Sequence, residues 1–244
     1  MQAQNKAVTL KKLRSIISQV FRHALEVEAP GVVADWTTQL RGRQYSRPIP
    51  KHMAALTKPN EVGHLMKSIL SYEEISLMTS LALRFSALTF ARPGEIRQAE
   101  WNEIDWEHTL WRIPAEKMKM RQPHLVPLAE QTLEVLRRLQ PITGHGRFLF
   151  PSSRSLEQPM SNATVLAAIR RMGFDKEQMS AHGFRGMAST ILNERGWNRD
   201  WIERQLAHSE KNKVRAAYLH SDFLADRRKM IQAWADLLDK WASN

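Results

Sequence analysis

The sequence predicts an α+β protein that is mainly helical and contains one small three-stranded antiparallel sheet. Apolar residues recur at three- and four-residue spacing along most of its 244 residues, which is the period of amphipathic helices. One region, residues 103–126, instead combines short β-type runs with turn residues. Because 43% of the residues are hydrophobic, the chain can bury a core and does not belong to the disordered class.

The first expected element is one amphipathic helix near the start of the chain. Its apolar positions follow the helical period at Leu13, Ile16, Ile17, Val20, Phe21, Ala24 and Leu25. Residues 41–60 then contain three prolines, one glycine and no hydrophobic period, as a linker does. We therefore expect residues 1–45 to be part of a small helical domain, 46–60 to be a linker and 61–244 to be the main domain.

The main domain is expected to contain a helix over residues 72–90, with acids in the first turn, where the helix dipole favours them. Another helix starts at Pro93, a residue that suits the first helical position. Short strands follow at residues 103–105, 110–113 and 125–126. From residue 128 onward the pattern predicts helices at about 129–140, 161–172, 185–195, 199–206, 213–219 and 223–241.

The charge distribution favours a polyanionic partner such as nucleic acid. The chain has a formal net charge of +11, and residues 1–60 hold ten basic but only three acidic residues. A positive charge gathered in this way is expected of a segment that contacts a phosphate backbone. The sequence has no cysteine, which excludes a disulfide scaffold, a zinc finger, an iron–sulfur site and a thiol nucleophile. It contains neither an apolar run that could span a membrane nor the apolar stretch of a signal peptide.

Two short motifs could bind an anion. His182 and Arg185 are three residues apart at a helix start, so an imidazole and a guanidinium could face one phosphate together. Arg92 directly precedes a helix whose free N–H groups also favour an anion. Each motif taken alone is better explained by a surface histidine or by a capping or ion-paired arginine.

Two further motifs add reactive side chains. The basic turn 116–121 lies between two expected strands and could present a lysine to a phosphate oxygen, although exposed turn lysines are common. His208 follows Gln205-Leu206-Ala207, and Tyr218, one of three tyrosines in the chain, comes ten residues later. A tyrosine flanked by alanine is more often a core residue, so this motif alone does not decide the function.

The order of these motifs resembles the tyrosine recombinase (phage integrase) family, and within it the P4-type prophage and genomic-island integrases. The resembling stretches are ARPGEIRQAEW, WRIPAEKMKMRQPHLVPL, AHGFRGMAST, QLAHSEKNKVRAAYLH and RRKMIQAWADLLDKW. They cover essentially residues 60–244, and residues 10–45 resemble the end of the family's core-binding domain. The resemblance implies that residues 1–45 are the C-terminal part of that DNA-binding domain and that 61–244 are the catalytic domain.

Carried over residue by residue, the resemblance implies six catalytic positions. They are Arg92, Lys119, His182, Arg185, His208 and the nucleophile Tyr218. Lys119 is chosen over Lys117 because the family's hairpin lysine lies seven residues before the apolar residue of the closing Val-Pro, here Val126. The two arginines would clamp the scissile phosphate, and removal of one such donor typically costs about 3–4 kcal/mol of transition-state stabilisation.

The implied reaction is site-specific cleavage and rejoining of double-stranded DNA through a 3′-phosphotyrosyl intermediate, which integrates or excises a prophage or genomic island. His182 would accept the tyrosine proton, His208 would donate to a phosphate oxygen, and Lys119 would protonate the leaving 5′ oxygen. The phosphodiester energy is kept in the covalent bond, so the scheme uses no metal and no cofactor.

The resemblance also implies the partners and the compartment. These are double-stranded DNA attachment sites, a tetramer of the protein on DNA, DNA-bending and directionality proteins, no membrane, and a bacterial cytoplasmic, nucleoid-associated location. A second reading of the sequence is a truncated DNA-binding remnant or regulator that keeps the catalytic fold but does not recombine.

The tail helix leaves two arrangements open. One apolar stripe runs from residue 223 to residue 241, and it either packs on its own domain or docks on a neighbouring protomer. If it docks on a neighbour, a chain that ends at Asp222 should still bind DNA but assemble poorly.

Overall fold

The computed structural model describes residues 2–42, 54–208 and 222–243, and the chain divides into two compact units, Met1–His52 and Met53–Asn244. In the first unit, α1 (Gln2–Glu26) is followed by the 3-10 helix η1 (Trp36–Gly42). Asp35 joins the two elements, because its carboxylate accepts hydrogen bonds from Ser18 at 2.6 Å and from the Thr37 amide at 3.0 Å. The predicted N-terminal helix is confirmed, whereas the assignment of residues 1–45 to a core-binding domain stays a prediction.

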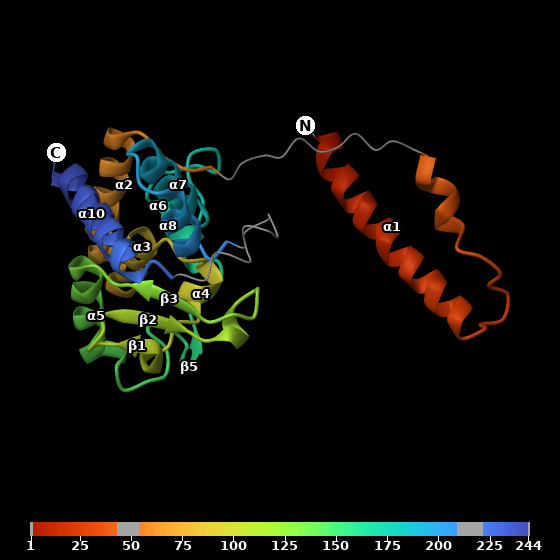
Figure 1. The fold of residues 1–244 in the computed structure, drawn as a ribbon, viewed down its shortest axis with the longest axis horizontal. Coiled ribbons are helices and arrows are strands. Elements are labelled where there is room, and N and C mark those ends of the chain that lie inside the picture. Colours follow the sequence, from red (N-terminus) through yellow and green to blue (C-terminus); the bar gives the residue numbers. More distant parts are fainter. Residues whose placement is uncertain (1, 43–53, 209–221, 244) are drawn as a thin grey trace. The chain divides into compact units, whose positions relative to one another are not determined.

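The second unit contains most of the helices (Figure 1). Their bounds are α2 Pro59–Ser71, α3 Glu73–Thr89, α4 Pro93–Arg97, α5 Glu130–Thr143, α6 Thr164–Arg171, α7 Gly183–Glu194, α8 Arg199–Gln205 and α10 Leu224–Ser243. Helix α2 was missed in the sequence and begins inside the predicted linker 46–60. Its buried positions Val62, Leu65 and Ile69 have the helical period, but the preceding prolines obscured it. The predicted helix at 213–219 lies outside the described residues.

The predicted three-stranded sheet is confirmed. Strands β1 (Ile104–Asp105), β2 (Leu110–Ile113) and β3 (His124–Pro127) pair antiparallel in that order. Trp111 of β2 is fully buried and lies edge-on to Phe85 of α3, so one face of the sheet packs on the helices. A hairpin of β4 (Pro151–Ser152) and β5 (Ser155–Pro159) was not predicted, because these residues are polar and mostly exposed and lack a strand pattern.

Helix α10 packs against its own unit, which decides between the two arrangements that the sequence left open. It lies alongside α2 (Figure 1), and the residues of its buried face are Met230, Ile231, Trp234, Ala235 and Leu238. The Trp234 indole is fully buried and donates to the carbonyl oxygen of Ala87 at 2.9 Å. Removal of α10 from a chain that ends at Asp222 would therefore expose the core. The expectation that such a chain still binds DNA and only assembles poorly depended on docking on a neighbour, and it does not follow from this packing.

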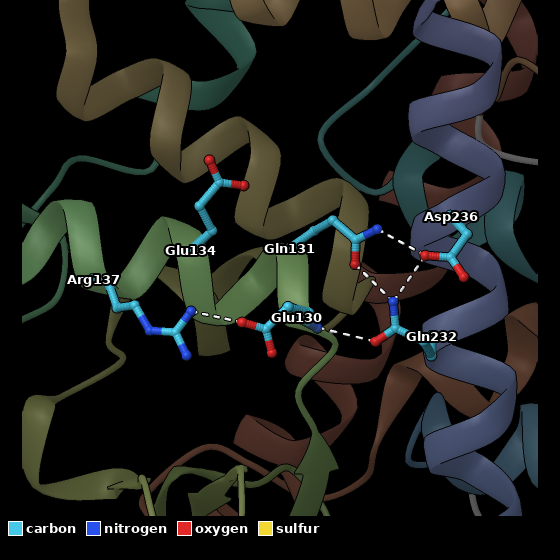
Figure 2. A pocket seen from close by; sticks show the side chains of 6 residues that line it. All are labelled: Glu130, Gln131, Glu134, Arg137, Gln232 and Asp236. Atoms are coloured by element: carbon cyan, nitrogen blue, oxygen red, sulfur yellow. Dashed lines mark hydrogen bonds and ion pairs between the residues drawn. The ribbon is translucent and has the colours of Figure 1, made fainter.

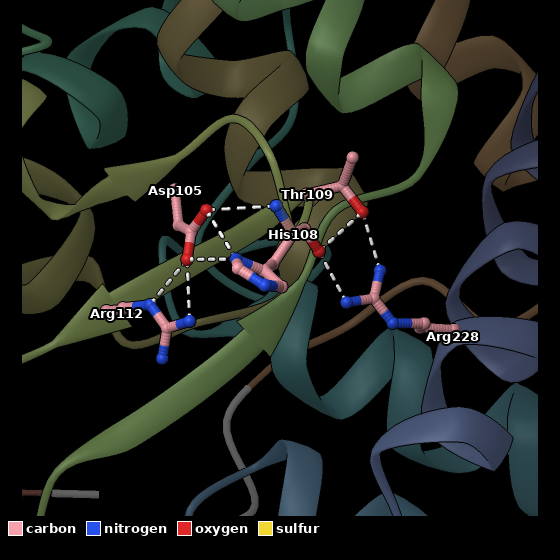
Figure 3. A network of polar contacts seen from close by, with 5 residues as sticks. All are labelled: Asp105, His108, Thr109, Arg112 and Arg228. Carbon is pink, nitrogen blue, oxygen red and sulfur yellow. Dashed lines mark hydrogen bonds and ion pairs between the residues drawn. The ribbon is translucent and has the colours of Figure 1, made fainter.

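Polar contacts hold α10 at two further places. On its outer side, Gln232 donates to Gln131 of α5 at 2.9 Å beside a shallow polar pocket (Figure 2). Near its start, Arg228 reaches the β1–β2 turn, where its guanidinium donates to the Thr109 hydroxyl at 2.5 Å (Figure 3). That turn is itself braced by Asp105, which accepts from the Arg112 guanidinium at 2.6 Å. The helix is thus attached to its own sheet and to its own α5.

A buried polar cluster joins the start of α10 to β3 and to the end of α8. Arg227 has no exposed surface and donates to the side-chain oxygen of Gln205 at 2.6 Å and to the carbonyl oxygen of Leu125 at 2.6 Å. His124 lies beside it, 3.2 Å from the carbonyl oxygen of Gln205. Burial, followed by the positive charge of Arg227, lowers the pKa of His124 to about 3, so its ring is neutral and Nε2 is the donor.

Substitution of Trp234 tests whether α10 packs on its own domain. Trp234→Ala removes a fully buried indole and its hydrogen bond. We expect the free energy of unfolding to fall by about 3–5 kcal/mol, as for other large core truncations, in urea titrations at pH 7. Trp106→Ala is the matched control, because the Trp106 side chain is 38% exposed and its loss should cost about 1 kcal/mol. Equal losses in the two variants would place α10 away from its own core.

The buried imidazole of His124 makes a second prediction about stability. In the unfolded chain its pKa returns to about 6.5, whereas in the folded protein it is about 3. Between these values the unfolded state binds a proton that the folded state does not, so stability falls as the pH falls from 6.5 towards 3.

His124→Gln should remove that contribution while keeping a donor for the carbonyl oxygen of Gln205. We expect the slope of unfolding free energy against pH between 6.5 and 4.5 to be smaller in this variant than in the wild type. His145→Gln, at an exposed loop histidine, should keep the wild-type slope. A slope that is unchanged in His124→Gln would show that His124 is protonated in the folded protein.

Candidate functional site

Arg92 lies at the N-terminal end of α4 and is held from two sides. Its guanidinium donates to Oε1 of Glu95 at 2.7 Å and to the carbonyl oxygen of Ala207 at 2.9 Å. The second carboxylate oxygen of Glu95 accepts the backbone N–H of Arg92 at 2.8 Å, so this carboxylate occupies the helix N-terminus that the sequence suggested for a phosphate. The side chain of Arg92 remains 23% exposed, so it can still offer N–H groups to a ligand.

Arg185 lies in the first turn of α7 and is only 9% exposed. Its guanidinium donates to the carbonyl oxygens of Phe90 at 2.9 Å and Leu206 at 2.7 Å, and it lies 3.2 Å from Nε2 of His208. The two carbonyl acceptors are uncharged. Burial, followed by repulsion from Arg92, lowers the pKa of Arg185 to about 10, which leaves it charged at neutral pH.

His208 is held between this arginine and a carboxylate. Its Nδ1 lies 2.8 Å from Oε2 of Glu203, and its Nε2 faces the Arg185 guanidinium, which can only donate. In the neutral ring, Nδ1 therefore carries the proton and donates to Glu203. The carboxylate of Glu203 therefore orients the ring.

His182 precedes α7 and is exposed. Loss of hydration lowers the pKa of its ring, and the positive charges of Arg185 and Arg92 lower it further. The same charges place His182 within electrostatic range of both arginines. At neutral pH its imidazole is therefore uncharged, with two cations nearby. In this state the ring can accept a proton.

Two residues with left-handed backbone conformations direct carbonyl groups at the arginines. Phe90 ends α3 with φ 39°, and Ala207 follows α8 with φ 48°. Residues other than glycine adopt this conformation only at some energetic cost. The carbonyl oxygen of Phe90 accepts from Arg185 and that of Ala207 accepts from Arg92, so both distortions occur where the guanidinium groups are held.

Helices α4, α7 and α8 thus bring four of the six predicted residues together, namely Arg92, His182, Arg185 and His208. Lys119 is exposed in the β2–β3 turn and makes no side-chain hydrogen bond or ion pair with another residue that the structure describes. Tyr218 lies outside the described residues, so its position relative to the arginines stays a prediction.

Sequence reasoning missed the groups that hold these side chains. Glu95 and Glu203 are the carboxylate partners of Arg92 and His208, and the neutral acceptors of Arg185 are backbone atoms. The three-residue spacing of Arg92 and Glu95 at a helix start was a usable signal for the first pair. The carbonyl acceptors have no side-chain signature in the sequence and depend on the tertiary structure.

The arrangement can bind a tetrahedral anion. Arg185 is a nearly buried cation that forms no ion pair with any described residue, and Arg92 supplies a second guanidinium beside it. Such a pair favours an oxyanion that can accept from both groups. Within the described part of the chain, no cluster of three or more His, Asp or Glu side chains could hold a metal, and no helix is long and apolar enough to cross a membrane.

Comparison with known sequences identifies relatives of one kind. Residues 56–224 match the Phage integrase family. The prophage integrase IntA of Escherichia coli K12 is 38% identical over 238 residues, which cover 98% of this chain and 56% of that protein. The integrase of Enterobacteria phage P4 is 46% identical over 178 residues, covering 67% of this chain and 40% of that protein. The chain therefore spans about half the length of these relatives.

Solved structures share the fold at low sequence identity. A lambda integrase dimer bound to a COC′ core site matches with a TM-score of 0.61 and 21% identity, over 84% of this chain and 74% of that one. A lambda integrase tetramer bound to a Holliday junction matches with a TM-score of 0.62 and 19% identity, over 85% and 60%. The XerA recombinase matches with a TM-score of 0.52 and 17% identity, over 93% and 82%. These likenesses show a shared fold.

Proposed function

Because this chain belongs to the phage integrase family, we propose that it carries the catalytic machinery of a tyrosine-type site-specific DNA recombinase. It cleaves and rejoins double-stranded DNA through a 3′-phosphotyrosyl bond, and thereby integrates or excises a prophage or genomic island. Since the chain spans about half the length of its relatives, the proposal concerns the chemical step above all.

One observation carries this proposal. Arg185 is a nearly buried cation held by uncharged acceptors, with Arg92 beside it. A buried charge without an ionic partner is costly, so this arrangement is expected where a ligand supplies the opposite charge. A DNA phosphate has that charge and can accept from both guanidinium groups.

The reaction proceeds as a transesterification at phosphorus. The Tyr218 oxygen attacks the scissile phosphate and forms an O–P bond, while the bond from phosphorus to the 5′ oxygen breaks. His182 accepts the phenol proton, and Lys119 gives a proton to the leaving 5′ oxygen. Arg92 and Arg185 offset the charge that grows on the non-bridging oxygens in the transition state. Attack by a 5′ hydroxyl of another DNA strand reverses the step and joins new partners.

His208 acts on the same phosphate. Glu203 at Nδ1 holds the ring so that Nε2 faces the Arg185 guanidinium, where a bound phosphate would lie. In this scheme Nε2 of His208 donates to a phosphate oxygen.

The proposed partners follow from the substrate. They are DNA attachment sites, further copies of the protein up to a tetramer on DNA, and DNA-bending and directionality proteins. Lambda integrase structures of a dimer and a tetramer on DNA support the assembly by analogy. Action on bacterial chromosomal DNA places the protein in the cytoplasm, at the nucleoid. The remnant reading is not favoured, because the four described catalytic positions keep their residues and lie in one site.

A covalent trapping experiment tests the proposed nucleophile. A nicked suicide substrate, made from DNA that flanks the coding region, is incubated with wild type and with Tyr218→Phe. We expect a protein–DNA adduct on a denaturing gel with wild type only, because phenylalanine has no oxygen to attack phosphorus. Tyr45→Phe is the control and should form the adduct. An adduct with Tyr218→Phe would exclude Tyr218, and DNA binding without any adduct would support the remnant reading.

The lowered pKa of His182 predicts the pH at which the rate of DNA cleavage begins to fall on acidification. A base must be uncharged to accept the tyrosine proton, and this ring stays uncharged below its ordinary value of 6.5. We expect the second-order rate constant of adduct formation, which reports the free enzyme, to fall only below pH 6.5. His182→Gln should be slower and lack this fall, whereas exposed His145→Gln should keep it. If the rate constant of His182→Gln fell in the same way at low pH, the base would be another group.

A further inference from the structure

The base of the β2–β3 turn is fixed by one lysine. Lys117 ends the short 3-10 helix η3 (Ala115–Lys117), and its ammonium group has three acceptors. It donates to the carbonyl oxygen of Gln98 at 2.8 Å, to Oε1 of Glu100 at 2.6 Å, and to Oε1 of Glu103. The Lys117 side chain is only 16% exposed.

The two carboxylates are buried, and each has a second partner. Glu100 also accepts from Arg147 at 2.8 Å, and Oε2 of Glu103 accepts the indole N–H of buried Trp111 at 2.9 Å. Two cations thus balance two carboxylates, and Lys117 and both carboxylates are largely shielded from water, whereas Arg147 is 62% exposed. Hydrogen bonds between charged groups in such surroundings resist displacement, so the base of the turn is anchored firmly.

The tip of the same turn is free of such anchors. Met118 is buried at 5% exposure, whereas residues 119–123 are all exposed. Lys119 is two residues from Lys117, so its Cα lies within about 7 Å of the anchored residue. The anchored base therefore limits where the ammonium group of Lys119 can reach.

The anchor also connects the turn to the element that carries Arg92. Gln98 directly follows α4, and Arg92 directly precedes it. Lys117 bonds the Gln98 carbonyl, so the turn is attached to one end of a five-residue helix whose other end holds the phosphate-binding arginine. This contact sets the distance between the turn and the phosphate site.

We propose that Lys117 is a positioning residue that holds the β2–β3 turn so that Lys119 reaches the leaving 5′ oxygen. The proposal rests on the proposed function. Lys117 does not itself touch the DNA in this scheme, because its three donors are used inside the protein. Its effect on cleavage should therefore appear only where proton transfer from Lys119 matters.

A substrate with sulfur in place of the bridging 5′ oxygen separates these effects. With oxygen, the P–O bond breaks as the Lys119 proton moves to the 5′ oxygen. With sulfur, the P–S bond breaks and the thiolate leaves without a proton, since thiols are far more acidic than alcohols. Loss of Lys119 or of its position should slow the first substrate but not the second.

We expect Lys117→Met to form the covalent adduct about 10- to 100-fold more slowly on the oxygen substrate, since small displacements of a catalytic group have effects of this size. On the sulfur substrate its rate should be within about threefold of wild type. Lys119→Met should show the same rescue. The double variant should be no slower than Lys119→Met alone, because Lys117 acts through Lys119.

Two controls separate positioning from folding. Lys117→Met leaves two buried carboxylates with Arg147 as their only cation. The double variant Lys117→Met, Glu103→Gln restores the charge balance, and its rate should also recover on the sulfur substrate. Lys176→Met removes an exposed lysine that lies 3.7 Å from Glu177, and it should leave both rates unchanged. Thermal unfolding of each variant gives its folded fraction at the assay temperature.

Equal slowing of Lys117→Met on both substrates would overturn the proposal, since the lysine would then act through the fold or through Arg92. An unchanged rate on the oxygen substrate would overturn it while the proposed function stands. If wild type forms no adduct on either substrate, the proposed function fails and this inference fails with it.

Discussion

The site depends on two consecutive carbonyl groups at the end of α8. The carbonyl oxygen of Leu206 accepts from Arg185, and that of Ala207 accepts from Arg92. Two guanidinium groups repel each other when they are held side by side, and the lowered pKa of Arg185 reflects this. The neutral carbonyl dipoles hold Arg185 without cancelling its charge, so that charge remains available to an anionic ligand, whereas Arg92 is also paired with the carboxylate of Glu95.

The end of α8 is in turn fixed by α10. Arg227 binds the side chain of Gln205, one residue before Leu206, and reaches β3 through the carbonyl oxygen of Leu125. Arg227 and Arg185 are both buried arginines with uncharged acceptors, but they differ in access. Arg227 is completely enclosed and every donor nitrogen has a partner inside the protein, whereas Arg185 lies beside Arg92 and His208. The first serves the fold, and the second is suited to a ligand.

The three-stranded sheet carries the proposed proton donor, Lys119. Its β2–β3 turn has an anchored base, held by Lys117, and an exposed tip that carries Lys119. Lys117 is already engaged with Glu100 and Glu103, whereas the choice of Lys119 as the proton donor, made from the spacing to Val126, stays a prediction. A residue that must reach DNA cannot also spend all its donors inside the protein.

The sequence by itself determined the fold class, the three-stranded sheet and the family, because helical period, short β-runs and motif order are local properties. It also named Arg92, His182, Arg185 and His208, whose clustering the structure then described. Tertiary structure alone decided that α10 packs on its own domain and which carbonyl groups hold the arginines. The Arg92–Ala207 and Arg185–Phe90 contacts join residues 115 and 95 positions apart, and no local pattern specifies such pairs. They arise only when the buried faces of several helices pack together, which fixes backbone groups that carry no mark in the sequence.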